Sequence, residues 1–178
     1  MIDDGLDIEP GPEYGTLSER RGGILTTFLL IVHGLLAVAL LGSITHQAIS
    51  VLVPAHKTAD SFVGRVRAVS APSYVSAIIV LYVATAILGG IIYGEYRMAV
   101  RVVLEQLDLW KANGAFELKE HFVALGLGML PAYWSFWRQP LAESETRARA
   151  VITATFAFIV WWSFLVGHIL NNIRGFGS

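Results

Sequence analysis

Histidines are the residues of this sequence whose positions carry the most chemical information. Four of the five fall within or beside long apolar segments, and these are His33, His46, His121 and His168. Ionisable side chains are costly inside a membrane, where they tend to face the protein interior or a cofactor. Their placement therefore predicts a site between helices.

Three of these histidines come from different apolar segments and lie toward the same membrane face. At about 1.5 Å per helical residue, His33 lies about 13 Å and His168 about 8 Å below that face. His121 lies near the boundary. Two imidazoles at similar depth on facing helices can supply both axial nitrogens of a b-type haem iron. We predict His33 and His168 as this pair, with His121 as the alternative partner of either. Trp161 and Phe164 share a helical face with His168, which predicts an aromatic wall.

A second haem on the first segment is not expected. The ring of His46 faces about 140° away from that of His33 around the helix axis. A purely structural role is the alternative for each histidine, because a membrane imidazole can bond to a helix carbonyl, to Thr45 or to Asn171.

Carboxylates beside His121 suggest another kind of site. Glu117 and His121 are one helical turn apart, and Glu120 adjoins them. Carboxylate and imidazole together can bind a metal ion, or accept protons near a quinone. Acidic residues in a first helical turn are equally explained by the helix dipole.

Four apolar segments must position these side chains. The chain of 178 residues is 54% hydrophobic and 15% charged, whereas soluble domains are about 25% charged. Each segment approaches or exceeds the roughly 20 residues that span a bilayer. The predicted spans cover about 24–53, 74–94, 118–137 and 150–173, within a transmembrane domain at 24–174. A polar acidic tail at 1–23, which does not resemble a signal peptide, and a short tail at 175–178 flank this domain.

Connection lengths predict how the spans are arranged. Short connections between the first two and the last two spans favour antiparallel neighbours. The middle connection has helical periodicity, and Asn113-Gly114 is a stop signal. Pro131 predicts a kink in the third span. The fold class is therefore all-α: an integral membrane, up-down-up-down four-helix bundle with an amphipathic connecting helix between spans two and three.

We call side A the membrane face that carries both termini and the middle connection, and side B the opposite face. Lys and Arg residues near the spans are almost evenly divided between them. Arg20-Arg21, directly before the first span, favours side A as cytoplasmic. The basic residues are scattered, so nucleic acid is not an expected partner. The chain has no Cys, which excludes thiolate sites within it.

The pattern resembles small bacterial four-helix membrane cytochromes b of the cytochrome b561 and CopD type. The residues that carry the resemblance are His33 in Val-His-Gly, His121 in Lys-Glu-His-Phe and His168 in Val-Gly-His-Ile. It covers the four spans at the level of architecture. It implies one haem b and a place in the bacterial inner membrane.

We therefore predict a membrane-embedded electron-transfer subunit of a bacterial redox or respiratory system. Its expected partners are the lipid bilayer, membrane or periplasmic redox subunits, and a quinone. The alternative is a non-catalytic membrane anchor or accessory subunit of a larger complex. A metal or proton permease is disfavoured, because no charged residue lies deep in spans one, two or four.

Overall fold

All the elements that the structure describes are helices. The computed structural model describes residues 17–53, 64–65, 70–138 and 145–176. The elements are α1 (Leu17–Leu52), the short 3₁₀ helix η1 (Ala71–Tyr74), α3 (Val75–Glu95), the π-helical η2 (Tyr96–Val100), α4 (Arg101–Gln106), α5 (Trp110–Arg138) and α6 (Thr146–Phe176). Most of the predicted N-terminal tail and of the two short connections lies outside these residues.

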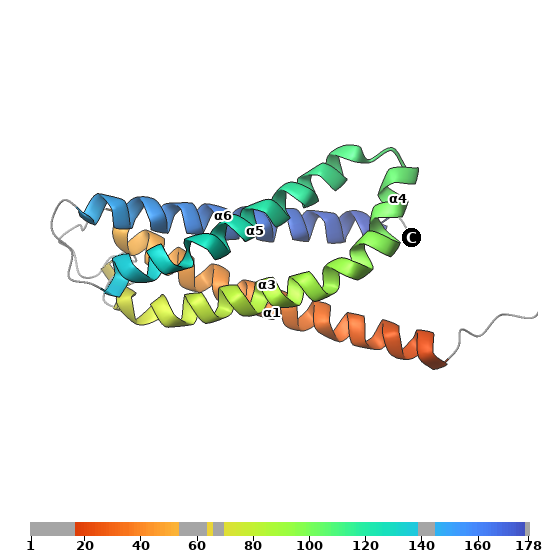
Figure 1. Ribbon diagram of the computed structural model, residues 1–178, viewed down its shortest axis with the longest axis horizontal. Helices are drawn as coiled ribbons and strands as arrows, with labels where there is room; N and C mark the ends of the chain where they lie inside the picture. The colour runs from red at the N-terminus through yellow and green to blue at the C-terminus, as the bar shows by residue number, and fades with distance from the viewer. Residues whose placement is uncertain (1–16, 54–63, 66–69, 139–144, 177–178) are drawn as a thin grey trace, which may run out of the picture.

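The four long helices pack in a ring. α1 contacts α3 and α6, and α5 contacts the same two helices from the other side. The start of α1, the end of α6 and α4 lie at one end of the molecule, which corresponds to side A (Figure 1). The end of α1 and the starts of α3 and α6 lie at the other end, side B.

Three helical stretches are long and apolar enough to cross a membrane, which indicates a membrane protein. They are Gly23–Leu52, Ala71–Gln106 and Thr146–Asn172. α5 is not among them, and its first half carries four charged side chains, those of Lys111, Glu117, Lys119 and Glu120.

The buried core lies in the side-B half of the bundle. It joins the end of α1, the start of α3, the end of α5 and the start of α6, with Ile44, Ile78, Tyr133 and Phe156 fully buried. Gln47 is also fully buried. It accepts a hydrogen bond from the Tyr133 hydroxyl, and its amide donates to the Ala71 carbonyl at 3.0 Å. This polar contact ties three elements together at side B.

Helix boundaries differ from the sequence-based prediction at the middle connection. The predicted stop at Asn113-Gly114 is wrong, because α5 runs through both residues. The break comes earlier, at Asp108, whose φ of 55° is left-handed. Asn113 is buried and accepts a hydrogen bond from the Tyr96 hydroxyl at 3.2 Å. Its amide therefore joins two helical segments and does not end one. Pro131 lies within the assigned helix α5.

Candidate functional site

A cavity of about 360 Å³ opens between the helices in the side-A half, next to the core. This volume lies within the range of cofactor and small-molecule sites. Helices α1, α3, α5 and α6 all contribute to its wall. The residues most relevant to ligand chemistry are His33, Thr85, Gly89, Ser163, Phe164 and His168. Two of the three histidines predicted to gather at side A therefore line one cavity.

The imidazole of His33 lies against the backbone of α3 at Gly89. A Cβ atom at Gly89 would lie 3.2 Å from His33 Cε1, which is tighter than an ordinary contact. Gly90 and Gly94 belong to a stripe of small residues that starts at Ala86 and recurs every fourth position along α3, and a Cβ at either glycine would meet nothing within 4 Å. The glycine that makes room for the histidine is thus one position away from that stripe.

Polar atoms without hydrogen-bond partners gather at this cavity. Within the described part of the chain, a few buried side-chain nitrogen and oxygen atoms make no hydrogen bond. Three of them belong to cavity-lining residues on three different helices: His33 Nδ1 on α1, Thr85 Oγ1 on α3 and Ser163 Oγ on α6. Buried polar groups are normally paired, and those that are not call for an explanation, such as a ligand or water. Their shared location makes the cavity a candidate binding site.

His168 lies on the side-A part of the cavity wall, and its side chain is exposed. Its ring is parallel to that of Phe164, with centroids 6.2 Å apart, so Phe164 forms the predicted aromatic neighbour. The Asn172 amide nitrogen lies 3.2 Å from His168 Nε2 and can donate to it. In that arrangement the Asn172 amide occupies the Nε2 lone pair that would bind a metal, so metal binding would replace this hydrogen bond.

His121 and Trp161, which the sequence placed at the same site, lie elsewhere. His121 is exposed, and its Nδ1 lies 2.7 Å from the Glu117 carbonyl oxygen of its own helix. Trp161 belongs to a separate, shallow and almost wholly apolar depression between α1 and α6. Helical spacing groups residues on a face, but it does not say which neighbour that face meets.

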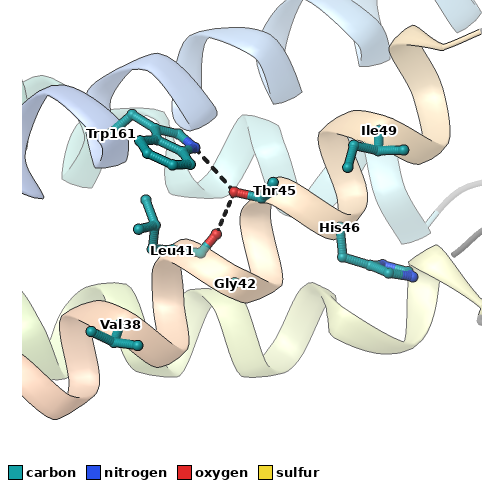
Figure 2. A pocket seen from close by; sticks show the side chains of 7 residues that line it. All are labelled: Val38, Leu41, Gly42, Thr45, His46, Ile49 and Trp161. Atoms are coloured by element: carbon teal, nitrogen blue, oxygen red, sulfur yellow. Dashed lines mark hydrogen bonds between the residues drawn. The ribbon is translucent and has the colours of Figure 1, made fainter. Parts of the chain in front are cut away.

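Figure 2 shows the depression that contains Trp161. The indole N–H donates to Thr45 Oγ1 at 3.0 Å, and this hydroxyl donates to the Leu41 carbonyl at 2.6 Å. Thr45 therefore accepts a hydrogen bond from a tryptophan, whereas the sequence suggested it as a hydrogen-bond partner of a histidine. His46 points away from Trp161 (Figure 2), and its ring packs against that of Tyr74 at a tilt of 30°, with centroids 4.6 Å apart.

The carboxylates near His121 are engaged in ion pairs. Glu117 Oε1 lies 3.2 Å from Arg101 Nη1, and Glu120 lies 2.8 Å from Lys119 Nζ. No group of three or more His, Asp or Glu residues able to hold a metal ion occurs among the described residues. Lys119 and Glu120 instead line the wall of the cavity, together with Glu95. Its lining thus combines apolar side chains with an ion pair.

No protein family, curated protein or solved structure matches this chain. Its function therefore has to be inferred from the cavity and the side chains that line it.

Proposed function

We propose that the chain is a membrane-embedded b-type haem electron-transfer subunit of a bacterial redox or respiratory system. One observation carries the proposal: His33 of α1 and His168 of α6 line a single cavity. Paired imidazoles from different helices are a common way of holding haem iron inside a bundle. The orphaned His33 Nδ1 supports this role, because a buried ring nitrogen without a hydrogen-bond partner is available to a ligand.

The lining residues divide into iron ligands and supporting groups. His33 and His168 would hold the iron, and the haem would supply one-electron redox chemistry. Gly89 leaves room for the His33 ring, and Phe164 packs parallel to that of His168. The apolar residues of the lining keep water away from the site. Trp161 has no part in this arrangement.

The proposal includes the topology of four spans. α5 packs against α3 and α6, so it would complete the bundle as a fourth crossing even though its first turns are charged. Both termini would then lie at side A, in the cytoplasm, with the protein in the bacterial inner membrane. Membrane or periplasmic redox subunits and a quinone are the proposed partners.

Visible spectroscopy of the detergent-purified protein, produced with excess haem, tests the proposal. The reduced wild-type protein should show the sharp bands of a low-spin b-type cytochrome. His33→Ala and His168→Ala each remove one axial nitrogen, so haem should be lost or become high-spin. His121→Ala is the matched control, because that imidazole does not line the cavity and its Nδ1 lies 2.7 Å from the Glu117 carbonyl oxygen of its own helix. His46→Ala should also leave the spectrum unchanged.

Two results would count against the proposal. A colourless wild-type protein that copurifies with large membrane partners would favour the accessory-subunit function. Loss of haem in His121→Ala but not in His168→Ala would contradict the ligand assignment.

A further inference from the structure

Two apolar side chains of α4 face outward and its two charged side chains are half-buried, while Leu104 is buried and Gln106 is exposed. A water-exposed helix turns charged side chains outward and apolar ones inward. In and beside α4, Met98 is 80% exposed, and Val102 and Val103 are exposed as well. Arg101 and Glu105 are only about one-third exposed, at 33% and 32% of their side-chain surface.

The inward charges have partners. Arg101 Nε lies 2.7 Å from Glu105 Oε1, and Arg101 Nη1 lies 3.2 Å from Glu117 Oε1 on α5. Asn113 donates to Glu105 at 3.5 Å and accepts from the Tyr96 hydroxyl. Charged groups that are held this way tolerate a medium that does not solvate them.

The outward apolar face continues the lipid-facing surface of α3. Exposed apolar residues recur along the chain at intervals of seven and four, as Val80, Ile87, Ile91, Met98 and Val102. These intervals keep residues on neighbouring turns of a helix. Ala71–Gln106 qualifies as one membrane-crossing stretch of 36 residues. As one straight α-helix this stretch would be about 54 Å long, well beyond a hydrocarbon core of about 30 Å.

A bend explains how the extra length fits. The π-helical η2 follows α3, and α4 turns away from the α3 axis toward α5 (Figure 1). On either side of the break at Asp108, Leu107 and Trp110 are exposed, and tryptophan favours the boundary between lipid and water. We infer that η2, α4 and the turn at 107–110 form a corner that joins α3 to α5 within the membrane at side A. The apolar face of residues 98, 102, 103 and 107 is embedded among lipids there.

Spin labelling tests this inference directly, because the chain has no native cysteine to remove. Single variants Met98→Cys and Val102→Cys are labelled and reconstituted in phosphatidylcholine–phosphatidylglycerol vesicles. Ile87→Cys, an exposed position in mid-α3, is the lipid reference, and Lys111→Cys is the polar reference. Collision rates with oxygen, which partitions into lipid, are compared with those of a water-soluble nickel chelate.

The labels at 98 and 102 should collide preferentially with oxygen, at a ratio close to that at 87 and several-fold above that at 111. Preferential collision with the nickel chelate would overturn the inference, because the corner would then project into water. Low collision rates with both reagents would also overturn it, since a second protein or a second copy would then cover the face. Either result leaves haem binding unaffected, because neither position lines the cavity.

Discussion

Among the described glycines, Gly126 has the least room for an added methyl group, because the Tyr82 side chain of α3 lies against it. The Tyr82 side chain crosses from α3 to α5, is 3% exposed, and donates its hydroxyl hydrogen to the Val123 carbonyl at 3.1 Å. A Cβ atom at Gly126 would overlap the Tyr82 hydroxyl and lie 2.6 Å from Tyr82 Cζ. Phe156 packs edge-on against the same ring, with centroids 5.5 Å apart, so the ring has little freedom to move aside. Gly126→Ala should therefore destabilise the bundle.

The expected cost combines three effects. Forcing one methyl group into a packed interior costs about 1–3 kcal/mol. Displacing the Tyr82 hydroxyl from Val123 costs about 1 kcal/mol more. The greater helix propensity of alanine offsets up to about 1 kcal/mol. The free energy of unfolding should therefore fall by about 1–3 kcal/mol. Gly128→Ala is the matched control, because a Cβ there meets nothing within 4 Å.

The measurement is unfolding by SDS titration in mixed micelles, followed by tryptophan fluorescence. A second variant, Tyr82→Leu, removes the phenol end and so makes room for the Gly126→Ala methyl group. The double variant should be less destabilised than the sum of the single variants by about 1 kcal/mol or more. The packing argument fails if Gly126→Ala matches Gly128→Ala within about 0.5 kcal/mol, or if the two substitutions prove additive.

Three further outcomes are expected. Gly89→Ala should lower the haem content per mole of protein, because its methyl group displaces the His33 ring, whereas Gly90→Ala should not; equal haem content in both variants would refute this. Gln47→Leu should lower the free energy of unfolding by about 1–3 kcal/mol in the same SDS titration, because it leaves the buried Tyr133 hydroxyl and a backbone carbonyl without partners; an unchanged midpoint would show that this contact is dispensable. Reporter domains placed after the C-terminus and between α5 and α6 should report opposite sides of the membrane, and the same side for both would rule out the proposed topology.

Helix positions and the membrane class could be predicted from the sequence. The length of an apolar segment is a local property of the sequence. In lipid, a segment such as 24–53 can form all of its backbone hydrogen bonds only as a helix. The match is close for α3 (Val75–Glu95), predicted at 74–94. It is poorest at the middle connection, where Asn113-Gly114 resembled a helix end. There the tertiary bond from Tyr96 to Asn113 outweighs the local turn preference.

For the histidine pair, the sequence could predict only the depth of each side chain along its helix. Counting residues placed His33 and His168 at comparable levels, because a helix converts sequence separation into height. Only the packing of the four helices decided that these two share a cavity while His121 faces outward. The same packing made Gly89 the residue that admits the His33 ring, and turned the charges of Arg101 and Glu105 inward. Such contacts depend on how each helix is rotated against its neighbours, which is determined by the fit of many side chains at once.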